Sequence, residues 1–285
     1  MQDRFVAITG CTSGIGRAAA VELARRGARL ALFCRSSEKG EALVDEIVRD
    51  GGLEPRLVLV DMASLDSVRE AADQFLASED SLDVLLNNAG VINKTRRESA
   101  EGFEEMLAVN HFAHFLLTGM LLPALQAGDR ARIVNVASGA YMFVRGIGFD
   151  DLQAEKRYST FKTYGRSKLA NILFTRTLAE RLKDVDITVN SLHPGGVSTG
   201  LGLQDDDLIT RIVPLLAKPF LRTPEKGAAT SVYLCCSDEV AETTGEYFYN
   251  CKRKALKPWA TDASAAEQLW SVTEELVGFS YPSVR

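Results

Sequence analysis

The chain has 285 residues, 46% of them hydrophobic, and a formal net charge of −5. This composition is typical of a water-soluble globular protein, and the acidic balance argues against a nucleic-acid partner, which would favour a basic surface. Five cysteines without zinc-ligand spacing predict reduced thiols, a cytoplasmic location and no bound metal. No run of 18 or more apolar residues is present, so we expect no membrane span.

Short apolar runs alternate with amphipathic segments along the first two thirds of the chain. The apolar runs predict strands at 4–9, 28–34, 56–61, 82–90, 131–138 and 186–195. The other segments predict helices at 14–27, 38–50, 64–78, 102–127 and 161–183. Because such alternation forms right-handed crossovers, we expect an α/β fold with a doubly wound parallel sheet. No linker divides the chain, which predicts a single domain over 1–285.

Three glycines, Gly10, Gly14 and Gly16, lie between the first strand and the first helix. Without Cβ atoms they permit a tight turn and close approach by a phosphate. The helix N-terminus would offer that phosphate free N–H groups and the positive end of its dipole. The spacing G-x-x-x-G-x-G differs from the commoner dinucleotide fingerprint, and a purely structural turn is the alternative.

Two residues at later strand ends bear on which nucleotide is bound. Arg35 ends the second strand, where an NAD-preferring site would place Asp or Glu for the ribose hydroxyls. Arginine can instead pair with a 2′-phosphate, which favours NADP(H) over NAD(H), although a solvated surface arginine is the alternative. Asp61 closes the third strand and could accept from the adenine amino group, cap the next helix, or do both.

Tyr164 and Lys168 stand four residues apart on a predicted helix and therefore share one face. An ammonium beside a phenol lowers the phenol pKa, which would make Tyr164 a proton donor or acceptor near neutral pH. Many helices carry Y-x-x-x-K by chance. The hypothesis therefore depends on Ser138, just past the fifth strand, and on the upstream glycines. Asn110 is a fourth polar candidate.

Two histidines, His111 and His114, have a spacing that could suggest a metal pair. No cysteine or carboxylate lies at a suitable helical spacing, and the neighbours are apolar, so we interpret both as core or helix-interface residues. His193 precedes Pro194 and Gly195, and we expect it to shape that loop.

The chain resembles the short-chain dehydrogenase/reductase family, which has a Rossmann fold, over roughly its first 200 residues. The matching segments, in family order, are TGCTSGIG (9–16), DM (61–62), NNAG (87–90), VN (109–110), IVNVAS (133–138), YGRSK (164–168) and HPG (193–195). The resemblance implies a catalytic tetrad of Asn110, Ser138, Tyr164 and Lys168. The cofactor site that it implies comprises Gly10, Ser13, Gly14, Ile15, Gly16, Arg35, Asp61, Met62, Asn88, Ala89, Gly90, Tyr164, Lys168, Pro194, Gly195, Val197 and Thr199.

A narrower resemblance, to the retinol dehydrogenase branch, reaches almost to the C-terminus. It rests on SLDSVRE, EGFE, NHFAHFLLT, KTYGRSKLANILFT and AEQLWSVTEELVG. Light-dependent protochlorophyllide reductases are also similar, but they usually carry Cys where Asn87 or Asn88 stands.

Three departures from the family pattern qualify this resemblance. Ser13 stands where many NADP-using members have a second basic residue. Ser138 and Tyr164 are 26 residues apart, about twice the common spacing, and the insert at 140–160 bears on oligomeric state. We expect a monomer or a homodimer. The chain has no apolar N-terminal anchor of the kind that retinol dehydrogenases often carry, so a membrane-bound retinoid role is less expected.

These implications define the expected function. We expect an NADP(H)-dependent oxidoreductase that interconverts an alcohol and a carbonyl, with a non-catalytic redox sensor or scaffold of the same fold as the alternative. The apolar segment 205–227, broken by Pro214 and Pro219, predicts a helical lid at about 200–225. Such a lid would favour a small-molecule substrate that is bulky and lipophilic, such as a steroid, retinoid, terpenoid or aromatic ketone. Packing on the sheet and a helix at a membrane surface are the alternatives for this segment.

Overall fold

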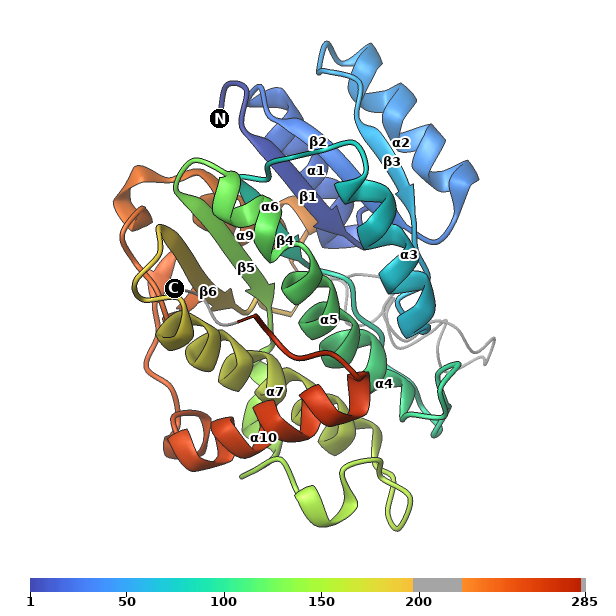
Figure 1. The fold of residues 1–285 in the computed structure, drawn as a ribbon, viewed down its shortest axis with the longest axis vertical. Helices are drawn as coiled ribbons and strands as arrows, with labels where there is room; N and C mark the ends of the chain where they lie inside the picture. Colours follow the sequence, from blue (N-terminus) through green and yellow to red (C-terminus); the bar gives the residue numbers. More distant parts are fainter. Residues whose placement is uncertain (197–221, 283–285) are drawn as a thin grey trace.

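The computed structural model describes residues 1–196 and 222–282, through which one eight-stranded sheet runs (Figure 1). Its strand order is β3-β2-β1-β4-β5-β6-β7-β8. The strands are β1 (Phe5–Thr9), β2 (Arg29–Cys34), β3 (Arg56–Leu59), β4 (Val84–Asn87), β5 (Ala131–Val136), β6 (Ile187–Leu192), β7 (Tyr247–Tyr249) and β8 (Lys252–Arg253). Every neighbouring pair is parallel except β7 with β8. The predicted doubly wound parallel sheet is confirmed, and its order reverses between β1 and β4.

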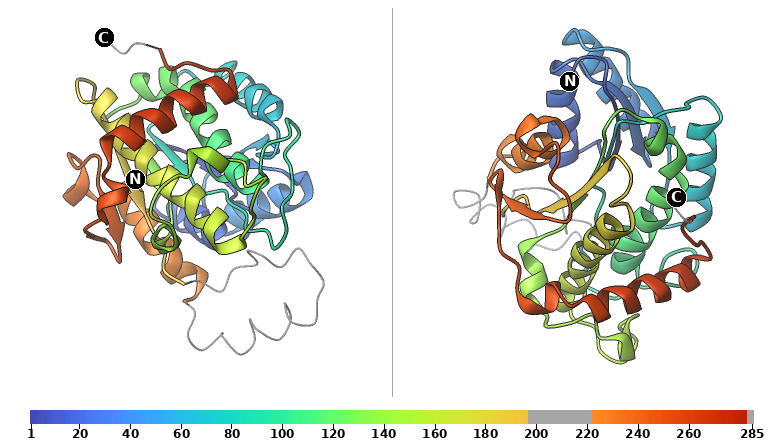
Figure 2. Two further views of the ribbon diagram at one scale, coloured as in Figure 1. Left: turned by 90° about the horizontal axis from the view of Figure 1, so that it is seen from below. Right: turned by 60° about the vertical axis from the view of Figure 1, so that its left-hand side comes forward.

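Helices cover both faces of the sheet, which explains why β1, β4 and β5 are buried at every position. One face carries α1 (Gly14–Arg25), α2 (Ser37–Arg49) and α9 (Pro224–Cys236). The other carries α3 (Leu65–Leu76), α5 (Ala113–Met120), α6 (Leu122–Ala127) and α7 (Thr160–Arg181). Helix α10 (Ala263–Val277) lies outside α7 and closes the second apolar layer (Figure 2).

The continuous helix predicted over 102–127 is wrong. The chain instead forms α4 (Glu105–Leu107), a π-helical turn η1 (Ala108–Phe112), α5 and α6. Apolar periodicity cannot distinguish a π turn from an α turn, because both keep the same face towards the core. Pro123 stands in the first turn of α6, where its missing N–H costs no hydrogen bond, so it begins a new helix.

Two further expectations concern residues near strand ends. Ser64, and not Asp61, caps α3, because the Ser64 side chain accepts from the Ser67 N–H. The insert at 140–160 forms two short 3₁₀ turns, η2 (Gly139–Phe143) and η3 (Phe149–Asp151), before α7 begins. Most of the predicted lid at about 200–225 lies outside the described residues.

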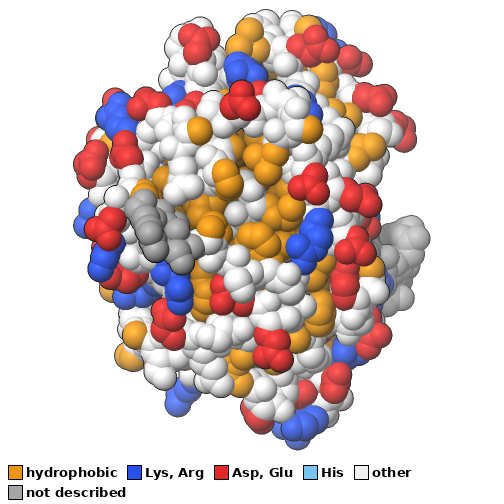
Figure 3. All heavy atoms as spheres, viewed as in Figure 1, with side chains coloured by type: hydrophobic (Ala, Val, Ile, Leu, Met, Phe, Trp, Pro, Cys, Tyr) orange, Lys and Arg blue, Asp and Glu red, His pale blue; other side chains and the backbone are white. Residues whose placement is uncertain are grey.

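The face seen in Figure 1 carries acidic and basic side chains mainly around its edge, and apolar side chains gather over its middle around α5 (Figure 3). Among the described residues, no helix combines the length and apolar character that a membrane span requires. Both observations describe the surface and assign it no partner.

Candidate active site

A cleft of about 450 Å³ opens at the carboxyl ends of the central strands. Such an edge is where doubly wound sheets bind ligands. The predicted cofactor residues that line it are Gly10, Ser13, Gly14, Ile15, Gly16, Arg35, Asp61, Met62, Asn88, Ala89, Gly90, Tyr164, Lys168 and Pro194. Gly195, Ser138 and Asn110 are not part of the lining, and Val197 and Thr199 lie outside the described residues.

The glycine turn is closed so tightly that side chains are excluded. Gly10 has φ +64°, and a Cβ built on it would lie 2.7 Å from the Cα of Ala89. A Cβ on Gly16 would lie 2.2 Å from the carbonyl oxygen of Gly10. Ser13 precedes α1 without a side-chain capping hydrogen bond, so the first N–H groups of the helix face the cleft uncapped. This cradle fits a phosphate.

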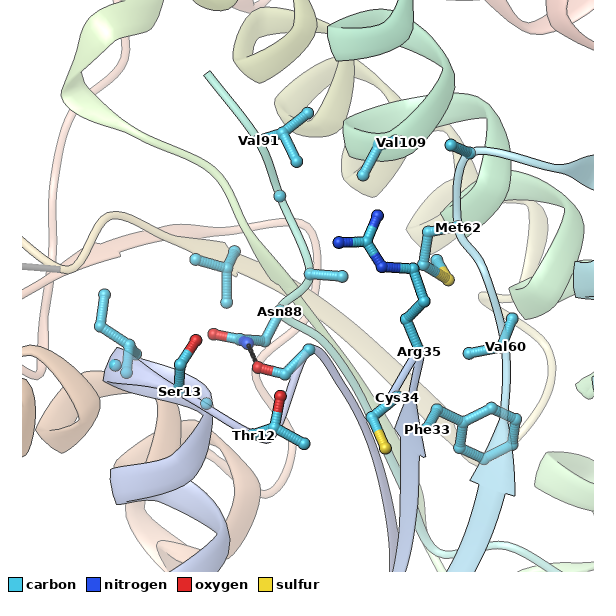
Figure 4. Close-up of a pocket in the computed structure, with 18 of the residues that line it drawn as sticks. Thr12, Ser13, Phe33, Cys34, Arg35, Val60, Met62, Asn88, Val91 and Val109 are labelled. Carbon is cyan, nitrogen blue, oxygen red and sulfur yellow. Dashed lines mark hydrogen bonds between the residues drawn. The ribbon is translucent and has the colours of Figure 1, made fainter. Parts of the chain in front are cut away.

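The hydroxyl of Thr9 holds the segment 88–90 against this turn. Its oxygen accepts from the N–H groups of Asn88 and Ala89, each at 2.9 Å. The Asn88 side chain returns two hydrogen bonds, to the carbonyls of Thr9 and Gly10. The bond to Gly10 is the dashed line at Asn88 in Figure 4. The cleft floor is therefore built from two chain segments that share their polar groups.

Asn110 lies within the π turn, and its side chain makes three hydrogen bonds. It accepts from the Val91 N–H at 2.7 Å, donates to the Val91 carbonyl at 3.0 Å, and donates to Ser167 Oγ at 2.9 Å. Ser167 in turn donates to the carbonyl of Tyr164. Asn110 thus ties α7, which carries Tyr164, to the chain just beyond the cleft floor. Single π turns occur frequently at functional sites.

His114 connects the π turn to Thr9. Because Thr9 Oγ1 already accepts two hydrogen bonds, its own proton must go to His114 Nε2, 2.9 Å away. The proton on the ring is therefore on Nδ1, which donates to the Asn110 carbonyl at 3.1 Å. Burial lowers the pKa of His114 to about 3, which agrees with a neutral ring. The predicted role as a buried histidine is confirmed, and the structure adds these two hydrogen bonds.

Ser138, Tyr164 and Lys168 lie together although 26 residues separate the first two. Tyr164 hydrogen-bonds with Ser138, and the Lys168 ammonium is 5.7 Å from the centre of the Tyr164 ring. Lys168 donates to the carbonyl of Val136 at 3.0 Å, and burial lowers its pKa to about 8.

The pKa of Tyr164 differs from expectation. The sequence predicted a pKa lowered by Lys168. Burial instead raises it, and the hydrogen bond with Ser138 opposes that shift. The reason is geometric, because the ammonium points to a backbone carbonyl and lies beside the ring, away from a direct bond to the phenol oxygen.

Arg35 extends from the end of β2 into the cleft, towards Met62 and Val109 (Figure 4). Lys39, which sequence reasoning missed, also lines the cleft from the first turn of α2. Its position four residues after Arg35 was the available signal. Asp61 accepts from the Ala63 N–H at 2.9 Å, which fixes its carboxylate at the cleft wall.

The loop after β6 is shaped by His193, as predicted. Its Nδ1 accepts from the Gly195 N–H at 3.0 Å, and its ring stacks on Tyr249 with centroids 4.2 Å apart. Burial lowers the His193 pKa to about 4, which keeps Nδ1 available as an acceptor. Across residues 1–196 and 222–282, no cluster of three His, Cys, Asp or Glu side chains could hold a metal ion.

Comparison with known proteins decides the family. The family model of the short chain dehydrogenases matches residues 4–207. The chain belongs to this family. Retinol dehydrogenase 14 of Mus musculus is 44% identical to it, over 98% of this chain and 87% of that protein. Retinol dehydrogenase 12 of Homo sapiens is 42% identical, over 99% and 88% respectively.

Solved structures agree with this assignment. An uncharacterized protein from Mycobacterium paratuberculosis is 30% identical with a TM-score of 0.79, covering 99% of this chain and 96% of that one. A structure described as an NAD(P)-dependent gluconate 5-dehydrogenase from Beutenbergia cavernae, with NADP bound, is 30% identical with a TM-score of 0.69. It covers 88% of this chain and 96% of its own. The protein is a short-chain alcohol dehydrogenase of the retinol dehydrogenase-like branch, acting on CH–OH groups.

The buried histidines predict an acid-sensitive fold. Burial lowers the pKa of His111 and of His114 to about 3, below the ordinary 6.5. As pH falls below 6.5, the unfolded chain binds protons that the folded chain excludes. The contribution of these two neutral rings to the free energy of unfolding is therefore complete above pH 6.5. It is lost as pH falls towards 3, at up to about 1.4 kcal/mol per pH unit for each ring.

We expect His114→Gln to flatten the dependence of the free energy of unfolding on pH between 6.5 and 4, measured by urea titration. Thr273→Val is the matched control, because it removes the hydroxyl that bonds His111 and adds no titrating group. This control should lower stability yet keep the wild-type slope. An unchanged slope in His114→Gln would contradict the assigned neutral ring.

Proposed function

We propose that the protein interconverts an alcohol and a carbonyl on a bulky lipophilic substrate, of the steroid, retinoid, terpenoid or aromatic ketone class, with NADP(H). The observation that carries this proposal is one cleft with a phosphate cradle at Gly10–Gly16 and the Tyr164–Lys168 pair in its lining. NADP(H), when bound, supplies or accepts the hydride. The chain supplies binding, orientation and the proton.

Tyr164 is the proton donor in carbonyl reduction and the acceptor in alcohol oxidation. Ser138, hydrogen-bonded with Tyr164, is placed to bond the same substrate oxygen. Lys168, held at the Val136 carbonyl, is placed to bind the nicotinamide ribose. Asn110 positions α7 through Ser167, and its support of a water-linked proton path from Lys168 remains a prediction.

The preference for NADP(H) is supported by two exposed cations at the end of β2. Arg35 and Lys39 both line the cleft, on either side of the α2 N-terminus that Ser36 caps. A 2′-phosphate between them would gain charge-assisted hydrogen bonds and the positive end of the helix dipole. Lys39 therefore offers the second basic group that Ser13 does not provide.

The lipophilic substrate class is supported by exposed apolar side chains on η2 and α7, the elements next to Ser138 and around Tyr164; these side chains border the site outside the cleft lining proper. Met142 and Phe143 follow Ser138 in η2, and Phe161 precedes Tyr164 by one turn of α7. Their side chains are 45%, 58% and 64% exposed, and the rings of Phe143 and Phe161 meet edge to face. Relatives named retinol dehydrogenases favour the same class. A cytoplasmic location and a monomeric or homodimeric state remain predictions.

Tyr164→Phe tests the acid. Loss of general acid–base catalysis should lower kcat by about 10²–10⁴-fold, while NADPH binding measured by fluorescence titration stays near wild type. Tyr158→Phe is the matched control, because the Tyr158 hydroxyl donates to the Asn93 carbonyl and does not line the cleft. Near-normal turnover by Tyr164→Phe would refute the mechanism.

Arg35→Asp and Lys39→Ala test the cofactor preference. Each charge-assisted bond to a phosphate contributes about 1.5–3 kcal/mol, so each variant should lose about 10- to 150-fold in the ratio of kcat/KM for NADPH to that for NADH. Arg49→Ala, an exposed residue at the far end of α2, should leave the ratio unchanged. Equal wild-type constants for the two cofactors would exclude the preference.

Phe161→Ser tests the substrate class. If this side chain contacts a lipophilic substrate, kcat/KM for retinal or an aromatic ketone should fall by about tenfold, and that for acetone should not change. Val48→Ser is the control, because Val48 is 46% exposed on α2, which packs on the opposite face of the sheet from α7. A wild-type preference for small polar substrates would defeat the proposed class.

A further inference from the structure

Two cysteine thiols meet beneath the cleft, at the ends of neighbouring strands. Cys11 belongs to the glycine turn after β1, and Cys34 is the last residue of β2 and lines the cleft. The Cys11 thiol hydrogen-bonds with Cys34. Cys11 Sγ also lies 3.7 Å from the Phe33 carbonyl, and Cys34 Sγ lies 3.4 Å from the Ser36 carbonyl.

The backbone holds the two strand ends in fixed register. Thr9 pairs with Phe33 across β1 and β2, and the Gly10 N–H donates to the Phe33 carbonyl at 3.1 Å. Continued by one residue, this register sets Gly10 opposite Cys34, so Cys11 follows the residue that faces Cys34 across strands about 4.8 Å apart. The sheet therefore brings the two thiols close together, although Cys11 and Cys34 are 23 positions apart in sequence.

The environments of the two sulfurs differ in a way that assigns them different roles. The hydrogen bond from Cys11 lowers the pKa of Cys34, against the opposing effect of burial, while the pKa of Cys11 is raised. The thiolate is the reactive form, so Cys34 is the nucleophile. Both residues are buried, but Cys34 borders the cleft and is 4% exposed, whereas Cys11 is 0% exposed and does not line it.

The other cysteines do not share this arrangement. Cys235 is buried in α9, where burial raises its pKa. Cys236 is its chain neighbour and hydrogen-bonds to the Val232 carbonyl, and Cys251 lies against Ala229 and Thr230. A reactive thiol with a second thiol in contact is the arrangement that redox-sensitive cysteines use.

We propose that Cys11 and Cys34 form an oxidative modification site, at which a hydroperoxide converts the thiol pair to a disulfide and thereby weakens binding in the cleft. Cys34 Sγ attacks one peroxide oxygen, the O–O bond breaks, and the leaving oxygen takes a proton to become water or an alcohol. Cys11 Sγ then attacks Cys34 Sγ, its proton goes to the departing hydroxide, and water leaves. Two thiols lose two electrons in total, and one hydroperoxide gains them.

The consequence for binding follows from the crowding of the turn. Bonded sulfurs lie about 2.05 Å apart, well inside hydrogen-bond distance, so the turn and the end of β2 must shift towards each other. Such a shift would disturb the close packing of Gly10 on Ala89, where a built Cβ would lie 2.7 Å from the Ala89 Cα. Since the turn is the proposed phosphate cradle and Arg35 follows Cys34 directly, oxidation should weaken NADP(H) binding; this part rests on the proposed function.

The test treats the fully reduced protein with hydrogen peroxide, with and without saturating NADPH, and maps the products by mass spectrometry. We expect a loss of about 2 Da, a peptide link between Cys11 and Cys34, and reversal by dithiothreitol. The dissociation constant for NADPH should rise by about tenfold or more, and bound NADPH should slow the oxidation. Peroxide that oxidises Cys251 but leaves Cys34 reduced would overturn the proposal. So would a link that leaves NADPH affinity unchanged.

Variants distinguish the role of Cys11 from that of Cys34. They also allow a failure of this proposal to be told apart from a failure of the proposed function. In Cys11→Ser, peroxide should leave a sulfenic acid on Cys34 that dimedone labels, with no link formed; an unlabelled Cys34 would refute its assigned role. Cys251→Ser is the matched control and should form the link as wild type does. If the reduced protein binds no NADPH, the proposed function fails, while the peptide map still decides whether the thiol pair reacts.

Discussion

The hydroxyl of Thr9 is the contact on which the rest of the site depends. It accepts from two backbone N–H groups of the 88–90 segment and donates to His114, so one oxygen joins β1, the chain after β4 and the start of α5. Two of these connections are buried and the one to Asn88 is partly buried; an unmade hydrogen bond in a buried place costs about 1–3 kcal/mol. These hydrogen bonds hold the segments of the cleft floor in a fixed arrangement. A cofactor that contacts any of them therefore binds to a preorganised surface.

Burial sets the electrostatics of the catalytic end. Lys168 is almost fully buried with a carbonyl oxygen as its acceptor, and burial shifts its pKa and that of Tyr164 in opposite directions, each towards the neutral form. Lys168 is thus held close to losing its charge, while Tyr164 is held more firmly in its neutral form. A cofactor phosphate or a substrate oxygen placed beside them acts on a poorly solvated pair, where a new charge has a large effect.

The sequence predicted the sheet well because each strand is a short apolar run ended by a glycine or polar residue, and burial on both faces leaves few other arrangements. It also predicted that residues near strand ends, such as Arg35 and Asn88, would belong to one site, and both line the cleft. It failed where the deciding contact is long-range. No local sequence pattern indicates that Lys168 donates to the Val136 carbonyl, that Asn110 lies in a π turn, or that Cys11 contacts Cys34.

The π turn has a consequence for how this helix tolerates changes in length. A π turn holds one residue more than the α turn it replaces, and each residue of an α-helix advances by about 100°. Deleting one residue between 108 and 112 would let a regular helix run from α4 into α5 with the apolar face of α5 still on the sheet. The same deletion would swing Asn110 away from Val91 and Ser167. A chain shortened in this way would keep its core and lose the tie between α7 and the cleft floor.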